Sequence, residues 1–420
     1  MEAIIERCAG LDVHQASVVA CVLCGPANQR PRKEVRTFGT MTCDLLELRD
    51  WLLSHGVTAV GMESTGVYWK PIYAVLEDHA QLIVGNAHHI KNVPGRKTDV
   101  KDSEWIADLI RHGLISASFV PPKPIQELRD LLRYRDKLTK MRTQQRNGLL
   151  KILETAGIKL SSVATDVFGV SGMAMLKALV AGERSPAKMA EMAKGRLRKK
   201  IPELEQALEG RIEPHHCFLL DMQIQLLEQI GANVARLETE IELKLEPFRE
   251  QHKRLTTIPG VDFVVAAIII AELGVQMSVF PTEQDLAAWV GVCPGSYESA
   301  GRRKSVRIRK GNVHLKTALV QAAKAAAKQK GSYLKDKYWR LKARRGAGRA
   351  TIAVAHKILV SAYHMLSKGT DYHDLGESFL DQLDRTRTVN NLVKRLKTLG
   401  CEVHVTERPP NSPEPERKAA

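Results

Sequence analysis

Four acidic residues lie where apolar segments end or begin in the first quarter of the chain. Asp12 follows the small and apolar residues 8–11 and precedes a second apolar run, 18–23. Glu63 closes the apolar run 57–62, at the carboxyl end of a predicted strand, where α/β sheets usually bind ligands. Asp99 and Asp102 open the segment 99–112, whose apolar spacing predicts a helix, and residues three apart share one helix face.

Each of these acids has an ordinary explanation when taken alone. Asp99 is a possible N-cap, Asp102 suits the first turn of a helix, and Asp12 suits a turn. Together they predict something else, because acidic side chains rarely enter apolar surroundings unless they are paired or bound to metal. Hard oxygen ligands favour Mg²⁺ or Mn²⁺ over zinc. Two such ions about 4 Å apart would activate a nucleophile and stabilise the leaving oxygen in phosphodiester cleavage.

Charge and composition restrict the class of protein. The 420 residues include 63 Lys and Arg against 47 Asp and Glu, a net charge of +16, so a polyanionic partner is expected. Seven scattered cysteines argue against a disulfide framework and favour a reducing cytosol. The longest apolar stretch, 263–271, is far short of the roughly 20 residues that span a bilayer. We therefore expect a soluble cytoplasmic protein without a membrane partner.

The pattern of apolar residues predicts an α/β domain followed by mainly helical regions. Residues 1–118 alternate strand and helix patterns, and prolines at 121, 122 and 124 punctuate the chain. The region 119–254 contains two heptad series, at Leu131, Tyr134, Leu138, Met141 and Ile152, and at Leu220, Leu227, Ile230, Val234, Leu237 and Ile241. They predict an antiparallel coiled coil or a dimer stalk, with a helical bundle inside one protomer as an equal alternative.

Between the two heptad series, residues 161–215 are predicted to form an insert of short helices joined by turns. Its basic run, 194–200, either contacts phosphates or forms a solvated face, and a solvated face is the commoner outcome. No chemistry is assigned to this insert from the sequence.

The region 255–370 carries a second group of candidate residues. Residues 257–261 around Gly260, followed by an apolar helix, are typical of a helix-hairpin-helix whose backbone amides face a phosphate, although an ordinary Pro-Gly turn remains the alternative. The glycine-bounded loop 294–301 contains Ser299. Basic residues expected to hold phosphate oxygens follow it: Arg302, Arg303, Lys304, Arg307, Arg309, Lys310 and Lys316. Residues 371–420 are expected to form a helical extension and a disordered tail.

These motifs resemble those of the DEDD-motif insertion-sequence transposases, which are bridge-RNA-guided serine recombinases. The resemblance covers residues 5–115 and 250–370. Two sets of motifs carry it in the same order along the chain: residues 10–13, 63–68 and 97–102 in the first stretch, and residues 258–261, 289–294 and 297–299 in the second.

The resemblance implies an amino-terminal RuvC-like domain of the ribonuclease-H type in which Asp12, Glu63, Asp99 and Asp102 bind divalent metal. It also implies a carboxyl-terminal transposase domain whose Ser299 becomes covalently joined to a DNA phosphate. Its implied partners are donor and target DNA, a structured noncoding bridge RNA and further copies of the chain, in a dimer or tetramer. The composite site of such proteins forms between the RuvC-like domain of one protomer and the serine domain of another.

Two alternatives stay open at this point. A RuvC-type structure-specific endonuclease would need the acidic residues but not Ser299. A nucleic-acid-binding protein that has lost catalysis would keep the scaffold without using either. A nucleotide-driven motor is not expected, because the sequence contains no G-x-x-x-x-G-K-[ST] phosphate loop.

Overall fold

The computed structural model describes residues 3–64, 66–87, 90, 102–295, 298–299, 301–303 and 307–406. The chain divides into two compact units, Met1–Pro121 and Pro122–Ala420, and the break falls among the prolines that punctuate the sequence. The finer division at residues 254 and 370 remains a prediction.

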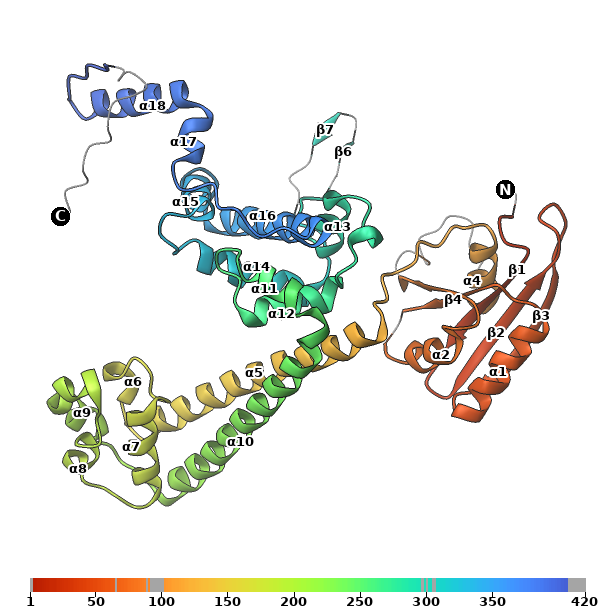
Figure 1. Ribbon diagram of the computed structural model, residues 1–420. Coiled ribbons are helices and arrows are strands. Elements are labelled where there is room, and N and C mark those ends of the chain that lie inside the picture. Colours follow the sequence, from red (N-terminus) through yellow and green to blue (C-terminus); the bar gives the residue numbers. More distant parts are fainter. Residues whose placement is uncertain are drawn as a thin grey trace. The chain divides into compact units, whose positions relative to one another are not determined.

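The first unit is built on a five-stranded mixed sheet with the order β3-β2-β1-β4-β5 (Figure 1). β1 (Arg7–Val13), β2 (Ser17–Cys24) and β3 (Arg32–Gly39) form an antiparallel meander. β4 (Ala59–Glu63) and β5 (Gln81–Gly85) extend the sheet in parallel with β1. This mixed sheet fits the ribonuclease-H-type domain expected from the resemblance.

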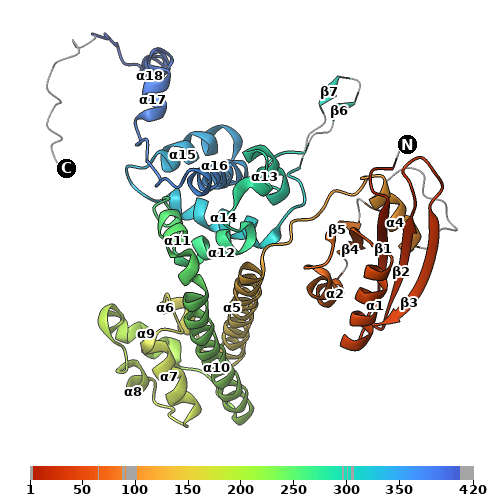
Figure 2. The same ribbon diagram turned by 45° about the vertical axis from the view of Figure 1, so that its right-hand side comes forward.

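Helices cover both faces of this sheet. α1 (Thr42–Ser54) and α2 (Trp69–Leu76) pack on one face, where Leu11, Val60 and Met62 are buried. α4 (Asp102–Arg111) packs on the other face, against Cys8 and Ala59 among others (Figure 2). Because neighbouring residues of a strand point to opposite faces, β1 and β4 are apolar nearly throughout, as expected for strands buried on both sides.

The second unit begins with two long helices that pack along each other. α5 (Lys123–Thr155) and α10 (Pro214–Leu245) lie side by side in both ribbon views. Glu127 is paired with Lys244 at 2.8 Å, and Arg135 donates to Glu238 at 2.9 Å, so the two helices are antiparallel. The apolar seams of α5 and α10 therefore pack against each other within one protomer, as a helical hairpin. The description of this hairpin as a coiled coil remains a prediction.

The predicted seam is accurate for α10 and only partly for α5. Leu220, Leu227, Ile230, Val234 and Ile241 are buried in α10, with Leu237 partly buried. In α5, Leu138 is buried but Tyr134 is 51% exposed, and Leu132 is buried where Leu131 is expected. The first half of α5 also packs on α12, so two neighbours set its buried face and a single heptad does not describe it.

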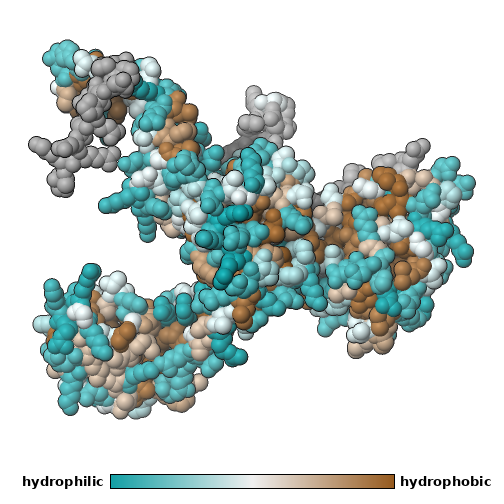
Figure 3. Space-filling model, in the orientation of Figure 1, coloured by the Kyte–Doolittle hydropathy of each residue, from teal (hydrophilic) through white to brown (hydrophobic). Residues whose placement is uncertain are grey.

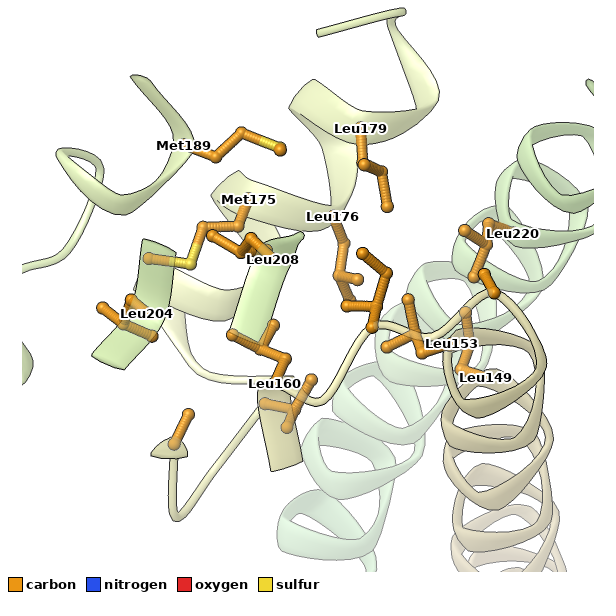
Figure 4. Close-up of a cluster of buried hydrophobic side chains, with 14 of the residues drawn as sticks. Leu149, Leu153, Leu160, Met175, Leu176, Leu179, Met189, Leu204, Leu208 and Leu220 are labelled. Carbon is orange, nitrogen blue, oxygen red and sulfur yellow. The ribbon is translucent and has the colours of Figure 1, made fainter. Parts of the chain in front are cut away.

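The insert between these helices folds around a core of its own. It consists of α6 (Leu160–Val163), α7 (Val170–Val180), α8 (Pro186–Ala190), the 3₁₀ helix η1 (Gly195–Lys200) and α9 (Ile201–Leu208). Figure 4 shows Leu160, Leu176 and Leu204 of the insert in one cluster that also takes in Leu153 of α5 and Leu220 of α10. The insert is thus a folded module on the end of the helical hairpin.

The remaining helices form the rest of the second unit. They are α11 (Arg249–Leu255), α12 (Phe263–Leu273), α13 (Glu283–Val290), α14 (Val313–Ala326), α15 (Tyr333–Arg345), α16 (Ala347–Lys368), α17 (Phe379–Leu383) and α18 (Arg385–Thr398). A two-stranded arm, β6 (Glu298–Ser299) and β7 (Arg302–Arg303), projects beside α13 in Figures 1 and 2. The predicted disordered tail falls mostly on residues 407–420, which lie outside the described residues.

Hydrophilic side chains cover much of the visible surface of the second unit (Figure 3). Within the described ranges, none of the helices combines the length and apolarity needed to cross a membrane.

Candidate functional site

Asp12 and Glu63 occupy matching positions on neighbouring strands. β1 and β4 are parallel, and their register pairs Cys8 with Ala59 and Leu11 with Met62, so Asp12 stands next to Glu63. Leu11 and Met62 are both buried under α1 and α2. The next residue of each strand therefore points to the opposite face, the one that α4 covers. The two carboxylates share one face at the carboxyl ends of adjacent parallel strands.

Two glycines bring α4 close to this face. Gly10 and Gly61 lie two residues before Asp12 and Glu63 on the same side of their strands. A Cβ at Gly10 would lie 2.2 Å from the Ser103 backbone oxygen, and one at Gly61 would lie 2.4 Å from Ile110 Cγ1. Any larger residue would push α4 away. The first turn of α4, which begins at Asp102, is therefore held against β1.

The four predicted ligands are only partly described. Asp102 is the first residue of α4 and is exposed, and the fully buried Ser103 follows it. Asp99 and the predicted start of this helix lie outside the described residues. The Asp12 carboxylate is 28% exposed and lies 3.2 Å from His14 Nε2. Among the residues that the structure describes, no three His, Cys, Asp or Glu side chains are close enough to hold a metal ion.

The chemistry of these donors nevertheless suits a hard divalent cation. Asp12 and Glu63 offer carboxylate oxygens from one face, with Asp102 on the covering helix. The two buried cysteines of this unit are not competing donors, because burial raises the pKa of both the Cys8 and the Cys21 thiols to about 12. Those thiols stay protonated at neutral pH, and a protonated thiol is a poor metal ligand. This favours structural thiols over a zinc site for the Cys21-x-x-Cys24 pair.

Ser299 lies in a short strand rather than in the expected loop. It pairs with Arg302 in the antiparallel β6–β7 ladder, and Glu298 pairs with Arg303. Nearer the helical body, the amide of Gly295 donates to the Arg307 carbonyl at 3.2 Å, and the amide of Arg309 donates to the Cys293 carbonyl at 3.3 Å. A two-stranded arm therefore carries Ser299, and the backbone pairing places an arginine directly across from it.

The predicted basic residues gather on this arm and at its base. Arg307, Arg309 and Lys310 are exposed, and Lys316 Nζ donates to the Arg309 carbonyl at 3.4 Å from α14. Arg302 and Arg303 form β7, while Lys304 lies outside the described residues. The assignment of all seven to nucleic-acid binding remains a prediction.

Gly260 lies in the connection between α11 and α12, where the sequence predicts a helix-hairpin-helix. Its φ is +84°, and a Cβ there would lie 2.3 Å from the Ala322 carbonyl and 2.6 Å from the Ala326 amide nitrogen. The glycine is thus explained by its left-handed conformation and by close packing on α14. Its predicted contact with a phosphate is not needed to explain the residue and stays a prediction.

A buried ion cluster that the sequence patterns do not predict fixes the base of the arm. Glu272 of α12 is 2% exposed and accepts two bonds of 2.8 Å from Arg133 of α5. Asn312 donates to the same carboxylate at 2.7 Å, and its own side chain caps α14 by accepting from the Leu315 amide. Arg129 donates to the Glu272 carbonyl at 3.0 Å. The sequence signal that could have pointed to this cluster is Glu272 itself, which is a carboxylate inside the otherwise apolar run 263–273.

Burial raises the pKa of Glu272, but the hydrogen bond from Arg133 and the charge of Arg129 outweigh it and leave the pKa below its usual value. The carboxylate is therefore ionised at neutral pH. Through Arg133 and Asn312, the cluster connects α5 of the helical hairpin to the start of α14, where the chain leaves the arm.

Replacing Glu272 should destabilise the protein strongly. Glu272→Ala leaves Arg129 and Arg133 without their carboxylate, and breaking a buried pair typically costs about 3–5 kcal/mol. Chemical denaturation followed by circular dichroism measures this loss. The matched control is Glu246→Ala, because Glu246 is 56% exposed and pairs with Arg249 at the surface. Its effect should stay below about 1 kcal/mol. Equal losses in the two variants would contradict the role of burial.

Comparison with known proteins places this chain among transposases. A family model for IS110-type DEDD transposases, described as "Transposase", matches residues 9–158. A second model, described as "Transposase IS116/IS110/IS902 family", matches residues 252–339. Together they account for more than half of the chain, and they contain both the Asp12–Glu63 face and the Ser299 arm. The insert lies outside both matched segments.

Individual relatives agree with the family models. The transposase for insertion sequence element IS1111A of Coxiella burnetii is 28% identical over 327 residues, covering 75% of this chain and 79% of its own. A probable family 20 transposase of Pseudomonas aeruginosa is 26% identical over 339 residues, with 78% and 89% covered. The transposase for insertion sequence element IS1328 of Yersinia enterocolitica is 24% identical over 283 residues, with 66% and 74% covered. The chain belongs to the IS116/IS110/IS902 family of transposases and is a DNA-processing enzyme.

Proposed function

We propose that this transposase excises and integrates an insertion sequence through a covalent serine–DNA intermediate. The pairing of Ser299 with Arg302 in the β6–β7 arm carries the serine part of the proposal. The register that brings Asp12 and Glu63 to one sheet face supports its metal-dependent part. Carboxylate oxygens gathered on one face are the ligands that Mg²⁺ and Mn²⁺ prefer. Asp12, Glu63, Asp99 and Asp102 would hold Mg²⁺ or Mn²⁺, which when bound polarises the phosphodiester.

Ser299 is the proposed nucleophile. Its Oγ forms a bond to the phosphorus, the bond from phosphorus to the leaving deoxyribose oxygen breaks, and the serine proton passes to a base while the leaving oxygen gains one. A hydroxyl of the new strand then attacks the serine phosphodiester, which reseals the DNA and restores the serine. Arg302 and its neighbours would offset the charge that builds on the phosphate oxygens. The covalent link conserves the phosphodiester bond energy for resealing.

The partners follow from the same proposal. The acids and the serine lie in separate units of the chain, so one protomer can supply the acids and another the serine, in a dimer or tetramer. Donor and target DNA are the substrates, and a structured bridge RNA would select them. The basic charge of the chain supports polyanionic partners in general but does not distinguish RNA from DNA.

Copurification tests the guidance part of this proposal. The protein is expressed from its own locus, including the flanking noncoding DNA, and the bound nucleic acid is sequenced. We expect a structured transcript from a flank, and addition of that transcript should be required for strand exchange between donor and target DNA. Strand exchange that proceeds equally without any RNA would reject guidance and leave the serine chemistry in place.

The competing candidate is a RuvC-type structure-specific endonuclease without a covalent intermediate. The acidic face supports both candidates equally, whereas the arm that pairs Ser299 with Arg302 supports the transposase mechanism.

A further inference from the structure

The insert has a surface hollow that neither the acidic face nor the serine arm uses. The hollow measures about 590 Å³. One wall is formed by residues 163–166 and by the start of α7, and the other by residues 194–200. It lies outside both segments matched by the transposase models, so the family assignment gives it no role.

Two close contacts fix the walls of this hollow. Gly172, in the first turn of α7, lies so near the preceding loop that a Cβ would stand 2.0 Å from the Val167 carbonyl oxygen. Across the hollow, the amide of Lys194 donates to Ser171 Oγ at 2.9 Å. The basic segment is therefore tied to α7 at its first residue, and Met175 and Leu176 anchor α7 in the core of the insert (Figure 4).

The charge of the hollow is strongly unbalanced. Lys194, Arg196 and Lys200 line it against a single acid, Asp166. Asp166 accepts from the amide of Phe168 at 3.0 Å, and Lys200 Nζ donates to the Val163 carbonyl at 3.2 Å. In the part of the chain that the structure describes, Lys194 and Arg196 form no ion pair.

Lys199 likewise forms no ion pair among the described residues, but three lysines on the insert or directly before it differ in this respect. Lys177 pairs with Glu228 at 2.6 Å, Lys188 pairs with Glu183 at 3.8 Å, and Lys159 pairs with Glu154. The cations at the hollow thus stand apart from the paired lysines elsewhere on the module. Such a cluster repels itself and gains most from an anionic ligand.

We propose that this hollow binds the phosphodiester backbone of a nucleic acid, which makes the insert an accessory anchor for the substrate or guide of the transposase. Guanidinium and ammonium groups on one wall contact phosphate oxygens, and the first-turn amides of α7, which no side chain caps, face the same space. DNA and RNA present the same phosphates, so the residues specify the backbone and not its source. The inference needs only a nucleic-acid-binding transposase and does not depend on Ser299.

A triple variant of the full-length protein tests the anchor. Lys194→Ala, Arg196→Ala and Lys200→Ala are combined, and binding of fluorescent duplex DNA, single-stranded DNA and a structured RNA hairpin is measured by anisotropy at several salt concentrations. The matched control combines Lys159→Ala, Lys177→Ala and Lys188→Ala, which removes the same charge from the insert and the residue that leads into α6. In the first variant only, we expect weaker binding and a shallower salt dependence. The slope should fall by about 0.9 for each duplex phosphate that the protein no longer neutralises, or by about 0.7 for single strands.

The three nucleic acids separate the possible sources. A loss of affinity confined to the RNA hairpin identifies RNA, one confined to a DNA probe identifies DNA, and one on all three identifies general binding of the backbone. Unchanged affinity and slope on all three, or equal losses in the control variant, would overturn the proposal. If the triple variant does not fold, the exposed Arg196→Ala is compared with the charge-conserving Arg196→Lys. Ser299→Ala should bind like the wild type, so failure of the serine mechanism leaves this test intact.

Discussion

Ser299→Ala should abolish both strand exchange and the protein–DNA adduct while leaving DNA binding unchanged. The substitution removes the only protein atom that is proposed to bond to phosphorus, and loss of a catalytic nucleophile lowers turnover by at least about 1000-fold. End-labelled donor DNA is incubated with protein and Mg²⁺, and adducts are separated by denaturing electrophoresis. The wild type should give a labelled band at the size of the protein, and the variant should give none.

A second serine on the same sequence segment is the control. Ser305→Ala leaves the charge of the basic run unchanged and should retain both adduct and exchange. Retained strand exchange in Ser299→Ala would reject the covalent mechanism and favour the endonuclease candidate. An adduct that persists in Ser299→Ala but disappears in Ser305→Ala would move the nucleophile to the other serine.

The strands that carry the acids could be predicted from the sequence because they are buried on both faces and therefore consist mostly of apolar residues. β1, β2 and β4 are short, mostly apolar runs, and such runs are recognisable in a sequence whatever their surroundings. The register, meaning which residues of two strands lie side by side, could not be predicted from the sequence, because it depends on which strands become neighbours in the sheet. Only the pairing of Leu11 with Met62 shows that Asp12 and Glu63 stand side by side.

Other elements were missed for identifiable reasons. The edge strand β3 has few buried residues, and its charged sequence carries little strand pattern. α1 was missed although Leu45, Leu48, Trp51 and Leu52 follow helical spacing, which was an available signal. The Glu272 cluster joins residues of α5, α12 and the start of α14 that lie far apart in the sequence, and no local pattern predicts such a meeting.

Neutralising the acids of the sheet should stop catalysis without unfolding the first unit. Asp12→Asn and Glu63→Gln keep the size of each side chain and remove one negative charge from the α4-covered face. Replacing a residue that only hydrogen-bonds to a metal ligand typically lowers metal affinity or activity about 10–100-fold. Loss of a ligand itself should therefore lower the rate of adduct formation at least about 100-fold. Adduct formation is measured against Mg²⁺ and Mn²⁺ concentration, and thermal unfolding is followed in parallel.

The control variant changes an acidic residue on the other side of the same sheet. Asp50→Asn removes a charge from α1, which covers the opposite face of the sheet, and should change neither activity nor its dependence on metal. The amide variants keep the size of each side chain, and the Asp12 pair with His14 is partly exposed, so without metal the thermal stability of both variants should stay close to that of the wild type. A loss of stability together with unchanged metal dependence would mean that these acids serve the fold and not a cation, and the metal centre would then have to be sought elsewhere in the chain.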